Sequence, residues 1–287
     1  LTIIMNHKEV NIRVSTIPTV YGENLVLRLL DASSGINTMD KIGLSENDIH
    51  AIKRNLALPY GMILCTGPTG SGKSTTLFAM LSEINKPDTN IITLEDPVEY
   101  RMEHIRQVQL NHKAGMTFAS GLRSILRQDP DAVMIGEIRD SETSKVAIQA
   151  ALTGHMVFST VHTNDATGAL TRLVDMGVER FLVASVLLVT IAQRLVRRVC
   201  PYCKKSYKPS DKELKFWGLE NREPVNFVKA TGCSQCMDTG YKGRIGIYEI
   251  LYMDDEIRQM ILQEKSAQEI AKSTTLSGRL TTLKMDA

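Results

Sequence analysis

The stretch that decides the fold is residues 67–75, which read GPTGSGKST. It fills the pattern G-x-x-x-x-G-K-[ST] and lies between a short apolar run and a segment with helical spacing, which is the context of a phosphate-binding loop. Its glycines let backbone N–H groups approach phosphate oxygens, and the start of the following helix adds partial positive charge. The expected ATP-binding residues are Gly67, Pro68, Thr69, Gly70, Ser71, Gly72, Lys73, Ser74 and Thr75.

A site that hydrolyses a nucleotide also needs ligands for Mg²⁺ and a base for the attacking water. Lys73 is expected to reach the β- and γ-phosphates, and the Ser74 hydroxyl to join the Mg²⁺ shell. Glu137 follows a short apolar run and is the candidate acid on the Mg²⁺ side. Glu95 ends another such run and is the candidate base, with a solvated loop acid as the alternative. His162 follows a third run, in a position to hydrogen-bond the γ-phosphate.

Around the loop, short β-rich runs alternate with amphipathic segments. The expected strands are residues 62–66, 90–94, 132–135 and 156–161, and the expected helices are residues 46–57, 73–84, 117–127, 141–152 and 165–176. This alternation predicts an α/β domain with a parallel sheet. The longest apolar run, residues 181–192, is too short to span a bilayer and is interpreted as a buried helix.

The two ends of the chain differ in character from this centre. The first thirty residues alternate between apolar and polar types, which predicts the end of an antiparallel sheet domain that begins upstream of residue 1. A strand over 244–252 and helices from residue 254 are expected at the other end. The predicted organisation is the sheet domain (1–33), a linker and helix (34–58), the nucleotide-binding core (59–196), a cysteine module (197–240) and a C-terminal strand with helices (241–287).

The composition restricts the classes of function. Among 287 residues, 43% are hydrophobic and 23% are charged, which excludes collagen, low-complexity disorder and a membrane-embedded bundle. Lys and Arg total 34 against 32 Asp and Glu, so the net charge is only +2. This near-neutral charge, together with 5% aromatic residues, argues against a nucleic-acid partner.

Four of the five cysteines form two Cys-x-x-Cys pairs that bracket 29 residues. Four thiolates supply a complete tetrahedral shell for structural Zn²⁺, and the absence of a secretory signal favours a reducing cytosol. Unliganded or redox-active thiols are the alternative. The predicted ligands are Cys200, Cys203, Cys233 and Cys236, whereas Cys65 is interpreted as a small core residue. Phe216, Trp217 and Leu219 are expected to supply the apolar contacts of this module.

The order of the motifs resembles the type II secretion and type IV pilus assembly ATPases, the GspE/PilB group of secretion ATPases. The resemblance rests on the phosphate loop, on TLEDPVE at 93–99, on LRQDPDAVMIGEIRD at 126–140 and on TGHMVFSTVHTND at 153–165. Residues 13–18 and 22–30 also resemble the end of the second N-terminal domain of this family. The resemblance therefore covers nearly the whole chain.

This resemblance implies a RecA-like P-loop core that works in a homo-hexameric ring. It implies that Glu95 is the base, that Glu137 acts at Mg²⁺, and that His155 and His162 are the histidines of the third motif. It also implies that Arg13 and Arg28 act as arginine fingers on the nucleotide. From the sequence alone, each of these arginines would be interpreted as a solvated strand residue.

The implied function is Mg²⁺-dependent ATP hydrolysis that powers assembly of a type IV pilus or of a type II secretion pseudopilus. The implied partners are an inner-membrane platform protein and the proteins of a cytoplasmic ring, which would hold a cytoplasmic motor peripherally at the inner membrane. The cysteine module favours assembly or secretion over pilus retraction, and a hinge is expected near residues 31–40. The alternatives are a helicase or packaging motor on the same fold, and a nucleotide-gated scaffold with little turnover.

Overall fold

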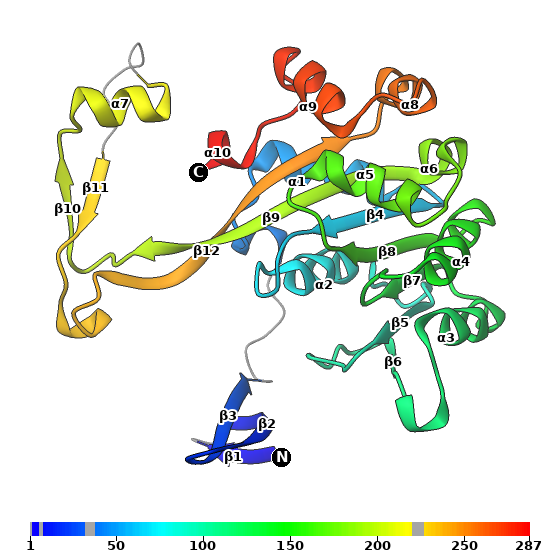
Figure 1. Ribbon diagram of the computed structural model, residues 1–287, viewed down its shortest axis with the longest axis horizontal. Helices are drawn as coiled ribbons and strands as arrows, with labels where there is room; N and C mark the ends of the chain where they lie inside the picture. Colours follow the sequence, from blue (N-terminus) through cyan, green and yellow to red (C-terminus); the bar gives the residue numbers. More distant parts are fainter. Residues whose placement is uncertain (1, 6–7, 32–37, 220–226) are drawn as a thin grey trace.

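A seven-stranded sheet forms the centre of the computed structural model (Figure 1). The structure describes the chain except residues 1, 6–7, 32–37 and 220–226. Within this part the strand order is β12-β9-β4-β8-β7-β5-β6, in which β12 runs antiparallel to β9 and the other neighbours are parallel. The strands are β4 (Gly61–Thr66), β5 (Ile91–Glu95), β6 (Arg106–Gln109), β7 (Ala132–Ile135), β8 (Met156–Val161), β9 (Leu187–Val199) and β12 (Tyr241–Tyr252).

Helices cover both faces of this sheet because its central strands are buried on both sides. On one face, α1 (Glu46–Leu56) and α2 (Lys73–Ile84) contribute Ile52, Leu77 and Leu81 to a buried cluster. On the other face, the second cluster takes residues from most of the remaining helices of the core. These are α3 (Phe118–Ile125), α4 (Ser141–Leu152), α5 (Ala166–Asp175), α6 (Arg180–Val186), α8 (Asp255–Leu262) and α9 (Ala267–Leu276). The predicted α/β class is therefore confirmed.

The prediction of one helix over residues 181–192 was wrong. The helix α6 ends at Val186, and β9 begins at Leu187. Residues 189–191 are Val, Thr and Ile, whose β-branched side chains favour extended backbone, and β9 pairs there with the buried strand β4. The edge strand β6 was not predicted, because its sequence RQVQ has no apolar run and only β5 holds it in the sheet.

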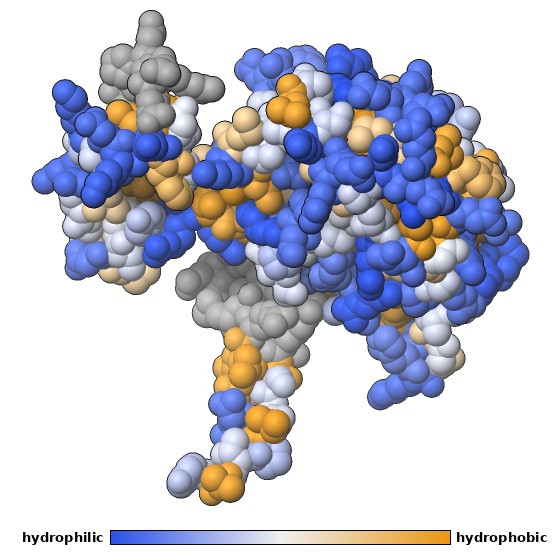
Figure 2. Space-filling view, turned by 45° about the horizontal axis from the view of Figure 1, so that its top comes forward, coloured by the Kyte–Doolittle hydropathy of each residue, from blue (hydrophilic) through white to orange (hydrophobic). Residues whose placement is uncertain are grey.

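Three strands form a separate antiparallel sheet at the start of the chain, as the alternation predicted. They are β1 (Thr2–Met5), β2 (Lys8–Thr19) and β3 (Gly22–Asp31). Ile17, Leu25 and Leu27 are exposed on this sheet, where Figure 2 shows a concentration of apolar surface. The expected hinge at residues 31–40 falls largely outside the described residues, and the domain limits stay a prediction.

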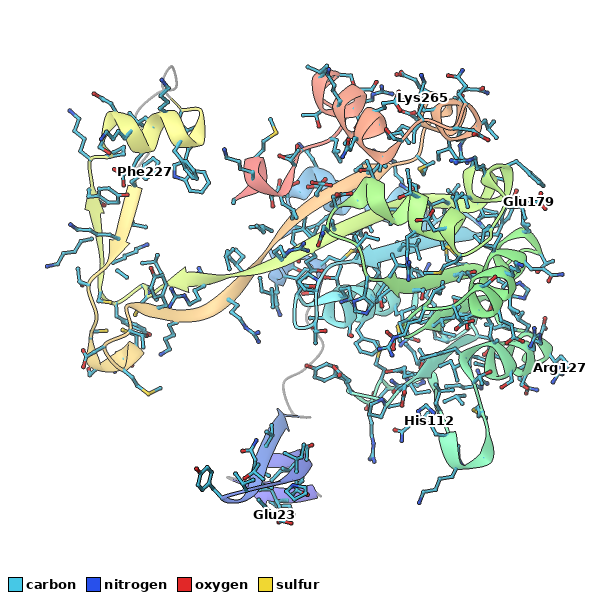
Figure 3. All side chains as sticks on the ribbon, in the orientation of Figure 1. Glu23, His112, Arg127, Glu179, Phe227 and Lys265 are labelled. Carbon is cyan, nitrogen blue, oxygen red and sulfur yellow. The ribbon has the colours of Figure 1, made fainter. Side chains whose placement is uncertain are left out.

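The strands β9 and β12 extend beyond the core as a two-stranded ribbon that carries the cysteine module (Figure 1). The module contains β10 (Lys204–Tyr207), α7 (Asp211–Trp217) and β11 (Phe227–Ala230). One aromatic contact of the module joins Tyr207 and Phe227, whose ring centroids lie 5.9 Å apart, and Figure 3 shows Phe227 on this outlying module. Phe216 and Trp217 do contact each other within the module, with ring centroids 4.9 Å apart, but both side chains are exposed and form no buried core there.

Among the described residues, no helix combines the length and the apolar character needed to cross a membrane. The chain ends with the short helix α10 (Leu283–Asp286), which contacts β12.

The central strand β8 allows a direct test of the core. Phe158 is 0% exposed, so Phe158→Ala is expected to lower the free energy of unfolding by about 3–5 kcal/mol through lost burial and a residual cavity. Chemical denaturation monitored by circular dichroism measures this loss. The control is Phe181→Ala at a side chain that is 53% exposed, and equal losses in the two variants would contradict the assignment of the core.

Candidate functional site

The phosphate loop joins β4 to α2 at the carboxyl edge of the parallel strands, where open α/β sheets bind ligands. Gly67 and Gly72 have φ angles of 142° and 92°, which side-chain-bearing residues rarely adopt. A Cβ atom on Gly67 would lie 2.5 Å from the carbonyl oxygen of Gln193, and one on Gly72 would lie 2.7 Å from Gln193 Nε2. The loop therefore follows β9 so closely that these two positions require glycine.

Hydrogen bonds hold the loop and the residues around it in place. Lys73 Nζ donates to the carbonyl oxygens of Gly67 and Pro68 at 2.8 and 3.0 Å, and burial lowers the pKa of its ammonium group. Thr76 Oγ1 donates to Gln193 Oε1 at 2.8 Å. The lysine thus occupies the mouth of the loop, at the position where it would meet phosphate oxygens.

Arg194 connects the back of the loop to the turn that follows β8. Its guanidinium donates to the carbonyl oxygens of Gln193 and Asn164 at 3.0 and 2.9 Å. The sequence reasoning missed Gln193 and Arg194 because it assigned the preceding run to a helix. The available signal was a polar pair directly after an apolar run, which is typical of the carboxyl end of a buried strand.

Glu95 is the last residue of β5 and is only 4% exposed. Burial raises the pKa of its carboxyl group, although Oε1 accepts hydrogen bonds from Thr93 Oγ1 at 2.5 Å and from Gln107 Nε2 at 3.1 Å. Glu95, Ser74 and Glu137 line one small cleft beside the phosphate loop. The structure therefore brings together three candidate residues that lie on three different segments of the chain.

Glu137 follows β7, and its carboxylate is largely buried. Its Oε2 atom lies 2.5 Å from Arg139 Nε and 3.4 Å from His162 Nε2, so His162 also belongs to this side of the sheet. The backbone N–H of Thr163 donates to Thr66 Oγ1 at 2.8 Å, which fixes the turn after β8 against the end of β4.

His155 lies at the opposite end of β8 from His162. Its carbonyl oxygen accepts from Gly61 N at 3.2 Å, and its Nδ1 atom is 2.9 Å from the carbonyl oxygen of Ala150. A strand rises about 3.3 Å per residue, so the length of β8 separates His155 from the phosphate loop by roughly 20 Å. The structure does not bring His155 to this nucleotide site.

The register of β2 and β3 places Arg13 directly opposite Arg28. Both side chains lie outside the described residues, so their role as arginine fingers stays a prediction.

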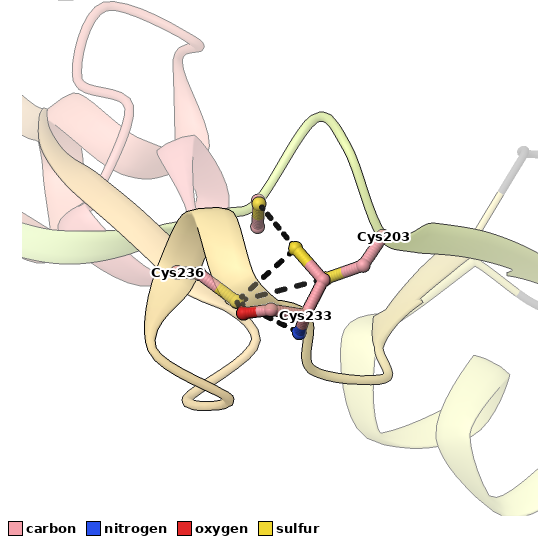
Figure 4. Close-up of side chains that lie close together, drawn as sticks. Cys203, Cys233 and Cys236 are labelled. Carbon is pink, nitrogen blue, oxygen red and sulfur yellow. Dashed lines mark hydrogen bonds between the residues drawn. The ribbon is translucent and has the colours of Figure 1, made fainter.

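The four sulfur atoms of Cys200, Cys203, Cys233 and Cys236 lie within 4.8 Å of one another (Figure 4). Three of the separations are 3.9 Å (Cys200–Cys233), 3.8 Å (Cys203–Cys236) and 3.7 Å (Cys233–Cys236). Four thiolates in a tetrahedron about 2.3 Å from a zinc ion would have their sulfurs about 3.8 Å apart. The cluster therefore fits Zn²⁺, and it fills the shell without leaving a position for water.

Backbone N–H groups support the ionised form of one of these thiols. Burial acts to raise the pKa of Cys236, but hydrogen bonds from Cys233 N and Gly240 N, both at 3.2 Å, hold that pKa below its usual value. In contrast, burial raises the pKa of the core thiol Cys65 to about 12 and keeps it neutral, as expected for a small core residue.

Residues 1–285 match the family model described as Type II/IV secretion system protein. The chain belongs to this family. It is 51% identical over 271 residues to the type II secretion system protein E of Pseudomonas aeruginosa, which covers 94% of this chain and 54% of that protein. It is 50% identical over 275 residues to the type IV pilus assembly ATPase PilB of Thermus thermophilus, which covers 95% of this chain and 31% of that protein. The resemblance found in the motifs is thereby confirmed.

The chain spans about half the length of the type II secretion relatives that it matches, 54% and 53% for two of them. Among solved structures, the pilus retraction motor PilT with bound ADP is 27% identical with a TM-score of 0.66, over 96% of this chain and 68% of PilT. The ATPase DotB of Legionella pneumophila is 24% identical with a TM-score of 0.67, over 97% of this chain and 68% of DotB, and shares the fold. These two structural neighbours support the RecA-like P-loop fold that the sequence predicted.

The cysteine cluster predicts the metal content. The protein purified under reducing conditions is expected to carry one zinc ion per chain, and Cys233→Ser is expected to lose it because three thiolates bind far more weakly than four. Elemental analysis by mass spectrometry measures both, with Cys65→Ser as the control that retains the metal. A wild-type chain that contains less than one zinc and has four reactive thiols would contradict the assignment.

Proposed function

We propose that the chain is the ATP-hydrolysing motor portion of a machine that assembles a type IV pilus or a type II secretion pseudopilus. The observation that supports this function best is the cleft beside the phosphate loop, which Ser74, Glu95 and Glu137 line together. A nucleotide whose phosphates lie on the loop would have its γ-phosphate next to that cleft. A base and the two candidate Mg²⁺ ligands are then within reach of the reacting group.

The loop binds the nucleotide, in this proposal, through the residues of the stretch from Gly67 to Thr75. Lys73 leaves the carbonyl oxygens of Gly67 and Pro68 and pairs with the β- and γ-phosphates, which are far stronger acceptors for an ammonium group. Ser74 and Glu137 hold Mg²⁺, which when bound neutralises charge on the phosphates. Arg139 Nε and His162 Nε2 both lie beside Glu137 Oε2, so these two neighbours orient the carboxylate.

Glu95 acts as the base that accepts a proton from the attacking water. Its burial raises the pKa of the carboxyl group, which makes the carboxylate a better proton acceptor than an exposed one. Thr93 and Gln107 bind one oxygen, Oε1, and thereby orient the side chain. His162 lies on the Glu137 side of the cleft, where its ring can hydrogen-bond the γ-phosphate and respond to its loss.

The proposed working form is a homo-hexameric ring in which Arg13 and Arg28 of one subunit neutralise charge on the nucleotide of its neighbour. Alternate closing and opening of the nucleotide sites would turn the N-terminal sheet against the core. The load is an inner-membrane platform protein, and further contacts to cytoplasmic-ring proteins hold the motor at the membrane. Zn²⁺ keeps a structural role in the cysteine module, because four sulfurs leave it no reactive position.

Hydrolysis by purified hexamer tests the role of Glu95. Glu95→Gln is expected to lower kcat for ATP by about 100-fold or more, because an amide cannot accept the proton, while nucleotide binding persists. Lys73→Ala is expected to lose binding as well, as measured with a fluorescent nucleotide. Glu83→Gln, at the far end of α2, is the matched control and should keep the wild-type rate. A wild-type ring that binds ATP without turnover would favour the nucleotide-gated scaffold instead.

Mixed rings test the proposed contribution of Arg13 across the subunit interface. Rings of Arg13→Ala subunits and rings of Glu95→Ala subunits are each expected to be inactive. Every site in the first ring lacks the arginine, and every site in the second lacks the base. On mixing, some interfaces combine an intact Glu95 with an intact Arg13 from the neighbour, so part of the hydrolysis should return. If mixing restores no activity at any ratio, the arginine does not act from the adjacent subunit.

A further inference from the structure

Glu249 is a buried carboxylate that the proposed reaction does not use. It lies on the edge strand β12, far along the chain from the phosphate loop and from the three motifs between residues 93 and 165, and is only 6% exposed. Its Oε1 atom accepts a hydrogen bond from Ala166 N at 2.9 Å, and its Oε2 atom accepts one from Leu283 N at 3.3 Å. Both oxygens are therefore committed to backbone N–H groups from segments far apart in sequence.

The first of these partners, Ala166, lies next to the turn that carries His162. Ala166 is the first residue of α5, and the turn from His162 to Asp165 directly precedes it. The N-cap residue Asp165 accepts from Gly168 N, so the N–H of Ala166 at the open end of the helix depends on Glu249. The carbonyl oxygen of Ala166 accepts from Thr190 Oγ1 at 2.9 Å. Both backbone groups of Ala166 are thus fixed by side chains from neighbouring strands.

The other end of the same turn is fixed to the phosphate loop. Thr163 N donates to Thr66 Oγ1, and Thr66 is the residue directly before Gly67. His162 adjoins this contact and lies beside Glu137. The turn is consequently held at one end by β4 and at the other by Glu249.

We propose that Glu249 is a positioning residue for the nucleotide site, which sets the His162 turn by anchoring the start of α5. The inference rests on the proposed function in one respect, namely that His162 serves in hydrolysis. The same carboxylate binds the C-terminal segment through Leu283, and Asp286 of that segment accepts from Tyr248 N at 2.7 Å. The C-terminal segment and the His162 turn therefore share one anchor on β12.

The chemistry of the anchor explains why a carboxylate occupies this position. An ionised carboxylate only accepts hydrogen bonds, so each of its two oxygens can face an N–H donor. A glutamine keeps one acceptor oxygen and places an NH₂ group against the other donor. A leucine of similar volume leaves both N–H groups without this partner, that of Ala166 in a buried position and that of Leu283 in a partly buried one. Glu249→Gln therefore removes one of the two hydrogen bonds, and Glu249→Leu removes both.

Amide hydrogen exchange of the whole chain tests the two hydrogen bonds of Glu249 without a measurement of activity. Glu249→Leu is expected to speed exchange of the amides of both Ala166 and Leu283, and Glu249→Gln that of only one of them, while amides of the phosphate loop keep their wild-type rates. Glu269→Gln, an exposed capping residue on α9, is the control in which neither amide changes. Unchanged exchange at Ala166 in both Glu249 variants would overturn the proposal.

Kinetics then tests whether the anchor acts through His162. Glu249→Leu is expected to lower kcat by roughly 10- to 100-fold with KM for ATP unchanged, because a displaced turn affects the reacting group more than phosphate-loop binding. Combined with His162→Ala, it should cause no further loss beyond that of His162→Ala alone. Fully additive losses in kcat, or a raised KM with normal kcat, would overturn the proposal. If Glu249→Leu does not fold, the same double-mutant cycle is measured with Glu249→Gln and His162→Ala. A wild-type ring without hydrolysis would contradict the proposed function alone, since hydrogen exchange still decides whether Glu249 anchors the turn.

Discussion

The close contact between β9 and the phosphate loop is the constraint on which the rest of the structure depends. Gln193 lies so near Gly67 and Gly72 that a methyl group at either position would collide with it, and its side chain also accepts the hydrogen bond of Thr76. This contact sets the shape of the loop and the start of α2. Because β9 continues outward to Cys200 and pairs along its length with β12, the same strand connects the nucleotide site to the cysteine module and to Glu249.

Several buried polar side chains of the core hold segments near the nucleotide site. Burial of a polar group costs free energy unless it is hydrogen-bonded, and each of these groups has a hydrogen-bond partner. Thr66 binds the turn after β8, Thr190 and Glu249 bind Ala166, and Thr93 binds Glu95. These contacts fix the turn after β8, the start of α5 and the side chain of Glu95 relative to the sheet. The candidate catalytic residues follow separate strands, so their relative positions depend on such contacts.

The two histidines of one motif show how a strand separates residues that the sequence places together. His155 and His162 flank β8, so the strand carries them to opposite edges of the sheet. Of these two histidines, His162 is the one that lies beside Glu137 in the part of the chain that the structure describes. The cysteines show the converse: two pairs separated by 29 residues come together because β9 and β12 run antiparallel and bring their ends side by side.

The sequence by itself determined the phosphate loop, the α/β class, most helices and strands near it, and the four cysteines, because these depend on local patterns of glycine, apolar spacing and paired thiols. It did not determine β6, the division of residues 181–192 between α6 and β9, or the exposure of Phe216 and Trp217, because pairing with neighbouring strands and packing decide them. Glu95 and Glu137 could be proposed from their places after strands, but only the sheet order brings them into one cleft with Ser74. Gln193 was missed because the run before it was assigned to a helix. Glu249 gave no usable signal, since its partners Ala166 and Leu283 lie 83 and 34 residues away, and only tertiary contacts place their N–H groups opposite its two oxygens.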